Sequence, residues 1–238
     1  MEPDNNQHND KAIWSDIKQK DRYLAISELI RGSQPNTNYY SLLILSSVII
    51  SAGLLLANSA ILIGGMLVTP VLTPVLLLSL GIVTSRMIVI RQTSKLIVRS
   101  FGLIFIISFL TSFIFGIPEN REFFNNAIFN NTLQSAFLYF LVAFASGVAA
   151  TFAWIRKEIA NVLPGISIAV SLVPPAALVG LWLAQGDLTM ARYFLFIFLF
   201  NMLGIVMSSM IVFSLLNFYR SGDNLLINSE ENNSSIKK

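Results

Sequence analysis

The chain has 238 residues, of which 54% are hydrophobic and only 12% charged, and its formal net charge is +3. Soluble domains carry about 25% charged residues, so this composition indicates a membrane protein. Cysteine is absent, which excludes a disulfide framework, a thiol nucleophile and a thiolate metal site. The basic residues are spread over several loops. We therefore assign the positive charge to membrane topology and expect no nucleic-acid partner.

Residues 1–38 are polar and are expected to form a cytoplasmic N-terminal segment. They lack the basic-then-apolar pattern of a cleavable signal peptide, so insertion is expected to use the later apolar segments. From residue 12 to residue 30, apolar side chains alternate with charged ones. This pattern fits an amphipathic helix on the membrane or on a neighbouring part of the protein, and it fits a short solvated helix equally well.

A membrane domain is expected over residues 39–219, since a helix of about 20 apolar residues crosses the hydrocarbon core. The first two spans share one uncharged run that is long enough to cross twice, with Asn58 as the turn and N-cap between them. The tail at 220–238 is rich in Asn, Ser and Glu and is expected to be disordered. The predicted fold is all-α, with six transmembrane helices at about 41–57, 59–84, 100–117, 133–155, 159–184 and 192–218.

The loop after the second span is predicted to be cytoplasmic, because it holds four cations and no acid: Arg86, Arg91, Lys95 and Arg99. Alternation then places the loop at 118–132 and the loop around Asp187 outside. Both termini are expected in the cytoplasm.

The stretch "LVTPVLTP" at 67–74 carries two prolines inside this apolar run. Proline has no N–H to bond back four residues, so Pro70 frees the carbonyl of Met66 and Pro74 frees that of Pro70. Broken backbone at membrane depth is tolerated only where it is buried in protein or lines a wet cavity. The prolines therefore predict a helix break at a functional site.

A second segment, "LVPPAALVGLWLAQG" at 172–186, resembles "LVTPVLTPVLLLSLG" at 67–81. Pro70 aligns with Pro175 and Gly81 with Gly186, and an Ala-Asn pair lies upstream of each segment. Three spans in each half would insert in opposite directions, which predicts two inverted repeats at about 41–117 and 133–218, with broken second and fifth helices. The alternative is that the prolines only kink packed helices.

The two predicted breaks define a candidate site for substrate. Thr69 and Thr73 are expected to cap half-helices that begin with proline, while Ser171 supplies a donor opposite. Small residues are expected to let the two broken spans approach closely, namely Gly64, Gly65, Ala176, Ala177 and Gly180. The candidate binding residues are Thr69, Pro70, Thr73, Pro74, Ser171, Pro174, Pro175, Asn58, Asn161 and Asn201.

No acid or base lies deep in either broken span, and the only histidine is His8. Tight cation sites and proton relays rely on buried carboxylates or histidines, so a neutral or anionic solute suits the site better. The spans hold no paired carboxylates, metal-ligand cluster or nucleophile with a base. We therefore expect no metal site, no cofactor and no enzymatic activity.

The stretches "SAGLLLANSAILIGGMLVTPVLTPVLLLSLGIVT", "LPGISIAVSLVPPAALVGLWLAQGD" and "FLFNMLGIV" resemble the prokaryotic hydrophobic-domain family known as domain of unknown function 389, over about residues 41–215. The resemblance implies a multispan membrane protein of undetermined activity. Many members carry an additional folded soluble domain, which these 238 residues are not expected to hold. The family tends to have glycine where this chain has Thr73, which puts a hydroxyl-specific role there in question.

These features predict a transporter of a prokaryotic plasma (inner) membrane that moves a small neutral or anionic solute by alternating access between the second and fifth spans. A channel is the alternative within the same class. A scaffold that interacts with lipid and transports nothing is the alternative from another class. The expected partners are the lipid bilayer, the solute and a second copy of the chain in a homo-oligomer.

Overall fold

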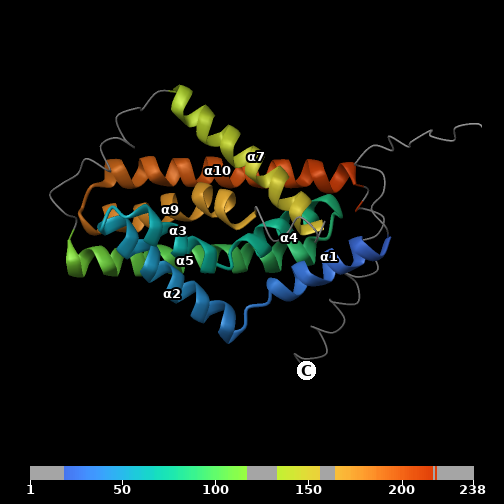
Figure 1. Cartoon of the computed structure of the whole chain (residues 1–238), viewed down its shortest axis with the longest axis horizontal. Coiled ribbons are helices and arrows are strands. Elements are labelled where there is room, and N and C mark those ends of the chain that lie inside the picture. The colour runs from blue at the N-terminus through green and yellow to red at the C-terminus, as the bar shows by residue number, and fades with distance from the viewer. Residues whose placement is uncertain (1–18, 117–132, 156–163, 217, 219–238) are drawn as a thin grey trace, which may run out of the picture.

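The computed structural model describes residues 19–116, 133–155, 164–216 and 218 (Figure 1). Every regular element in these ranges is a helix, which confirms the all-α class. The helices are α1 (Gln19–Gly32), α2 (Thr37–Leu55), α3 (Ser59–Val68), α4 (Leu72–Val83), α5 (Met87–Phe115), α7 (Leu133–Ile155), α9 (Pro164–Ala184) and α10 (Leu188–Leu215).

Four helices in the described part of the chain are long and apolar enough to cross a membrane: α2, α5, α7 and α10. The pair α3 and α4 qualifies together as a fifth span that is bent by 53°. These helices support a membrane-spanning protein, while the predicted number of six spans exceeds the four or five that length and composition identify. At about 1.5 Å per residue, α5 and α10 are each roughly 42 Å long and exceed the hydrocarbon core of about 30 Å.

Helix α5 begins at Met87, well before the predicted start of the third span near residue 100. The four cations were predicted to lie in a loop, but all except Arg86 lie on this helix, so that prediction is wrong for Arg91, Lys95 and Arg99. The helix extends this far because Val89, Thr93, Leu96 and Ile97 recur at helical spacing and are buried. Cationic side chains between them point outward and do not interrupt the helix.

The turn between α2 and α3 confirms the predicted role of Asn58. Its side chain accepts hydrogen bonds from the N–H groups of Ala60 and Ile61, at 3.0 and 3.2 Å. Its own N–H donates to the Gly53 carbonyl at 2.9 Å, with Ala57 in the left-handed region at φ 50°. This is the Schellman arrangement, in which a left-handed residue ends one helix and lets the next begin at once.

The turn between α9 and α10 has the same construction with different residues. Gly186 is the left-handed residue at φ 75°, and the Asp187 N–H donates to the Trp182 carbonyl at 3.2 Å. The Asp187 carboxylate then caps α10 by accepting from the N–H groups of Thr189 and Met190. Both turns therefore join antiparallel neighbours with very short connections.

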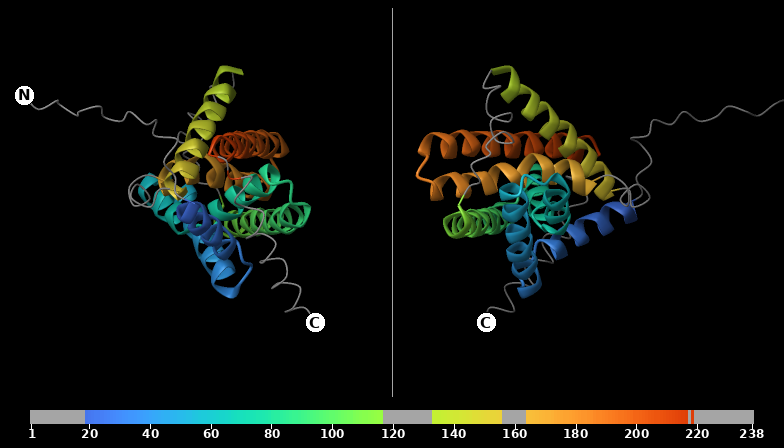
Figure 2. Two further views of the ribbon diagram at one scale, coloured as in Figure 1. Left: turned by 90° about the vertical axis from the view of Figure 1, so that its right-hand side faces the viewer. Right: turned by 60° about the vertical axis from the view of Figure 1, so that its left-hand side comes forward.

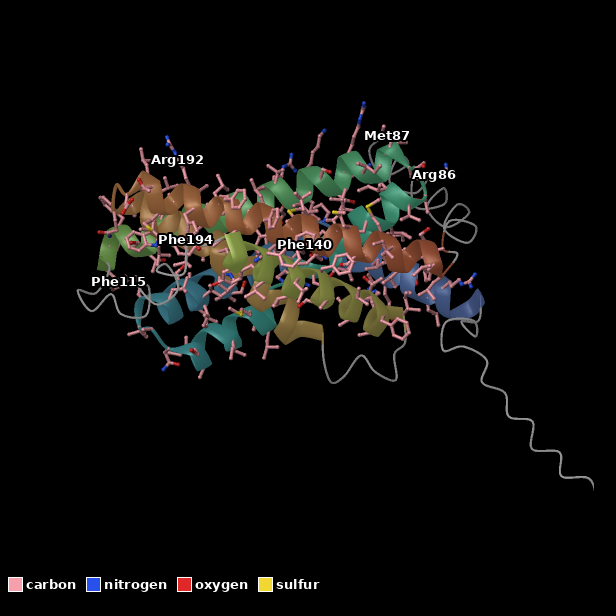
Figure 3. All side chains as sticks on the ribbon, turned by 90° about the horizontal axis from the view of Figure 1, so that it is seen from above. Arg86, Met87, Phe115, Phe140, Arg192 and Phe194 are labelled. Atoms are coloured by element: carbon pink, nitrogen blue, oxygen red, sulfur yellow. The ribbon has the colours of Figure 1, made fainter. Side chains whose placement is uncertain are left out.

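Helix α9 occupies the centre of the bundle and packs against α2, α3, α5, α7 and α10. Helices α5 and α10 follow the long axis of the molecule, and α7 crosses α10 obliquely (Figures 1 and 2). Figure 3 places Arg86 and Met87 at one end and Phe115, Arg192 and Phe194 at the other. The turn before α5 and the start of α10 are therefore at opposite ends of the molecule, as the predicted alternation requires.

Helix α1 lies on a neighbouring part of the protein and packs against α4 and α7. Its apolar face is fully buried through Ala25, Ile26 and Leu29, which are at most 1% exposed. The Arg22 guanidinium lies over the Phe218 ring, 6.0 Å from its centroid, beyond the end of α10. Helix α1 is thus docked on the bundle, which decides between a docked and a solvated helix for residues 19–32.

Candidate functional site

The second predicted span is interrupted at residues 69–71, where α3 ends at Val68 and α4 begins at Leu72. The two helices differ in direction by 53°. Pro70 lies in the interruption, since its ring and missing N–H prevent α3 from continuing. The break is enclosed on one side only. Met66 and Val71 are 3% and 1% exposed, whereas Leu67 and Val68 at the end of α3 are exposed.

Two of the last four carbonyls of α3 accept hydrogen bonds from Thr69, the residue that follows the helix. The Thr69 N–H donates to the Met66 carbonyl at 3.2 Å, and the Thr69 hydroxyl donates to the Gly65 carbonyl at 2.9 Å. Thr69 is therefore the C-cap of α3, and the prediction that it caps the following half-helix is wrong. A threonine hydroxyl commonly bonds back four residues in this way. The N-cap position of the following helix is occupied by Val71 instead.

On the N–H side of the break, at the start of α4, no side chain caps the free backbone groups. Val71 is the N-cap residue of α4 and makes no side-chain cap bond. The N–H groups of a first helical turn have no partners within their own helix, and they carry the positive end of the helix dipole. The break therefore presents two hydrogen-bonded carbonyls on one side, those of Gly65 and Met66, and N–H groups without a side-chain cap on the other.

Thr73 and Pro74 lie in the first turn of α4 and are buried. Helix α4 begins at Leu72, before Thr73, so the predicted capping role of Thr73 is wrong. Proline is tolerated in the first turn because its N–H would have no helical partner there. Thr73 contacts the end of α1, since a Cβ added to Gly32 would come within 2.7 Å of the Thr73 Cγ2.

The break predicted in the fifth span is not present. Helix α9 continues from Pro164 to Ala184 with Pro174 and Pro175 inside it. Neighbours on all sides stabilise this helix, and residues 172–182 are all buried. Ser171 lies on α9, where the structure does not describe its side chain, and Asn161 lies outside the described residues.

The alignment of the two proline segments does not extend to their helix ends. Gly81 lies inside α4, where its carbonyl accepts from the Arg86 N–H at 3.0 Å. Its predicted counterpart, Gly186, follows the end of α9 and adopts a positive φ. The two glycines therefore have different structural roles, and the sequence likeness is limited to the region around the prolines.

Helices α3 and α9 pack against each other, but the glycines predicted to allow this approach lie elsewhere. Gly65 packs against Ile50 of α2, and Gly180 packs against the backbone of Phe105 and Phe109 of α5. Ala176 and Ala177 are fully buried. Gly64 has open space beside it.

Hydroxyl groups between α2, α5 and α9 form a set of polar contacts that the sequence analysis missed. The Tyr39 and Ser100 hydroxyls are 2.8 Å apart, as are those of Ser51 and Ser108. The Ser112 hydroxyl donates to the Leu181 carbonyl at 3.2 Å. The spacing of Ser100, Ser108 and Ser112 by multiples of four residues was a usable signal, since it places them on one helix face.

Two candidate asparagines lie on other parts of the bundle, one at the turn before α3 and one on α10, which packs against α4. Asn58 is exposed at the turn where it caps α3. Asn201 is 1% exposed in the middle of α10. In the described part of the chain, Asp, Glu, Lys and Arg occur on α1, on Arg86 and the first half of α5, and at Asp187 and Arg192. The break is thus formed by neutral residues.

The chain is similar to Uncharacterized protein MJ0678 of Methanocaldococcus jannaschii, with 27% identity over 173 residues. The match covers 73% of this chain and 52% of that protein, so the chain spans about half the length of this relative. No solved structure matches the chain. Residues 66–207 contain the break, α9 and most of α10, and they match the family described as "Domain of unknown function (DUF389)", to which the chain belongs.

Proposed function

We propose that the chain is a membrane transport protein for a small neutral or anionic solute, and that the solute binds at the break between α3 and α4. The observation that carries the proposal is the N-terminus of α4, which begins inside the bundle without a side-chain cap. Interrupted helices in transporters use such ends to bind substrate groups.

The two sides of the break favour an anion over a cation. A cation would need free carbonyl oxygens and a neutralising carboxylate, but the Gly65 and Met66 carbonyls already accept hydrogen bonds from Thr69, and residues 66–74 contain no acid. A helix N-terminus offers N–H donors and roughly half an elementary positive charge. Thr73, buried in the first turn of α4, adds a hydroxyl that can donate to the same solute.

Movement of α4 relative to α3 would change access to this site. Helix α9 is continuous and packed on all sides, so we assign it the role of a fixed support. Helix α4 packs against α1, and Gly32 contacts Thr73, so α1 would move with α4. By the positive-inside rule, the Arg86 end faces the cytoplasm of a prokaryotic plasma membrane.

Flux through proteoliposomes tests the proposal. Swelling in iso-osmotic glycerol reports a neutral solute, and swelling in potassium acetate or potassium phosphate with valinomycin reports an anion. We expect saturable entry of at least one of these probes. Flux that rises linearly with concentration would indicate a channel. Flux no greater than in empty vesicles for all three probes would favour the scaffold over a transporter of this solute class.

A matched pair of variants tests the site. Thr73→Val keeps the shape and removes the hydroxyl at the start of α4, so entry of the active probe should fall about tenfold, the scale of one lost hydrogen bond. Thr84→Val makes the same change at the other end of α4, where the hydroxyl bonds back to Leu80. Equal flux in both variants would exclude Thr73 from the site.

A further inference from the structure

The first half of α5 carries an exposed basic face that the proposed transport site does not involve. Arg91, Lys95 and Arg99 are all exposed and follow one another at intervals of four residues. Residues spaced in this way share one side of a helix. Among the described residues, no carboxylate forms an ion pair with any of the three, so the face remains a concentrated positive surface.

The side of α5 that carries this face changes character abruptly along the helix. Beyond Arg99, the exposed large side chains are apolar, including Ile106, Leu110 and Phe113. Since about 20 helical residues cross the hydrocarbon core, a span counted back from Phe115 ends near Lys95. Arg99 then lies about 6 Å inside this boundary and Arg91 about 6 Å outside it.

The depth of the basic face therefore matches the layer of lipid headgroups, which is roughly 5–8 Å thick on each side of the core. Arginine and lysine stems lie along apolar surface while their charged groups reach toward this layer. Exposed Val98 lies next to Arg99, on the core side of Lys95. Such a mixture suits contact with both phosphates and the first carbons of the acyl chains.

Among the described residues, the basic face does not continue onto the neighbouring stretch of α10. The rings of Phe101 and Phe198 are 4.5 Å apart, which places the middle of α5 beside the first half of α10. From there toward the same end of the molecule, α10 exposes Leu203 and Met207. Topology alone requires only that cations be present on one side of the membrane, whereas this arrangement concentrates them on one helix face.

We propose that the face formed by Arg91, Lys95 and Arg99 binds the phosphate headgroups of anionic lipids in the leaflet at the Arg86 end. Guanidinium groups bind phosphate through paired hydrogen bonds, and juxtamembrane cations attract anionic lipid. The site is distinct from the break and does not depend on whether the chain transports a solute.

The test compares lipid retention by the full chain after exchange into an equal mixture of phosphatidylglycerol and phosphatidylcholine, measured by native mass spectrometry. The wild type should retain phosphatidylglycerol preferentially. The variant Arg91→Gln/Lys95→Gln/Arg99→Gln should lose about tenfold or more of this preference, since each cation contributes on the order of fivefold. The control Arg31→Gln/Arg192→Gln removes two exposed cations elsewhere and should keep it.

Thermal unfolding in phosphatidylcholine alone checks that the variants are folded, because the three side chains are exposed and their replacement should change stability little. The preference should also weaken as NaCl rises from 0.05 to 0.5 M. Equal retention of both lipids by the wild type would overturn the proposal, as would a preference that survives in the triple variant. Displacement of the lipid by millimolar inorganic phosphate would also overturn it, in favour of a site for the free anion.

Discussion

Two proline-containing stretches of this chain have opposite outcomes. Between α3 and α4, Pro70 lies in an interruption where the chain bends by 53°. In α9, two consecutive prolines lie inside a helix that continues past them. The two helices also differ in burial. Within α3 only Gly65 and Met66 are buried, whereas residues 172–182 of α9 are all buried.

The difference shows that neighbouring helices decide what a proline does at membrane depth. A proline in the interior of a helix removes one backbone hydrogen bond. Helix α9 packs against five other helices, which can hold its axis in place despite two lost bonds. Helix α3 lacks this enclosure. There the chain separates into two helices, and Thr69 supplies the replacement bonds.

The largest expected effect concerns how closely α9 is packed. In Gly180→Ala, the new Cβ would meet the backbone of Phe105 and Phe109, so α9 and α5 must separate. We expect a loss of about 2–3 kcal/mol in the free energy of unfolding. Gly64→Ala on α3 is the matched control, since nothing lies within 4 Å of its Cβ, and it should gain up to about 1 kcal/mol from helix propensity. Thermal unfolding of both variants in detergent measures the difference, and a similar change in both would contradict the contrast in packing.

The second prediction concerns replacement of each proline by alanine. Pro175→Ala restores an N–H inside a continuous helix, so the free energy of unfolding should rise by about 1–2 kcal/mol after allowance for the lost ring contacts. Pro70→Ala instead lets α3 and α4 join into one straighter helix. The distance from the start of α3 to the end of α4 would then increase by about 3 Å.

Because the chain has no cysteine, spin labels at Ser59→Cys and Ser85→Cys can report that distance directly. The distance should increase in Pro70→Ala and stay unchanged in Pro175→Ala. An unchanged distance in both would show that the bend is set by packing and not by Pro70.

Much of the fold could be predicted from the sequence. The range of α7 and the capping role of Asn58 follow from local rules, since a run of apolar residues and a polar side chain before a helix act over a few residues. The continuity of α9 could not be predicted in this way, because it depends on five neighbours that are distant in sequence. The site was predicted only in part for the same reason. Pro70 locates the break, but whether Thr69 caps the helix before it or after it is a matter of geometry.

The third prediction compares the turns that follow α2 and α9. Ala57 adopts φ 50°, which is strained for an L-residue, and Ala57→Gly should raise the free energy of unfolding by about 0.5–1 kcal/mol. Gly186 adopts φ 75° with open space beside it. Gly186→Ala should therefore lower the free energy of unfolding by about 1 kcal/mol through backbone strain alone. The thermal midpoint should rise in Ala57→Gly and fall in Gly186→Ala. Shifts of the same sign would show that the positive φ does not act alike in the two turns.

The smallest expected effect separates hydroxyls that join helices from hydroxyls that bond within one. Ser112 donates to the Leu181 carbonyl of α9 and accepts from Gln185, so Ser112→Ala removes a link between α5 and α9. Interhelical hydrogen bonds in membranes average about 0.6 kcal/mol, and we expect a loss of that size. Ser79 is equally buried but donates only to the Val75 carbonyl of its own helix, so Ser79→Ala should change stability by less than about 0.3 kcal/mol. Unfolding measured for both variants in the same detergent decides the matter. A loss for Ser79→Ala as large as that for Ser112→Ala would show that hydroxyl burial matters here and that the link to α9 does not.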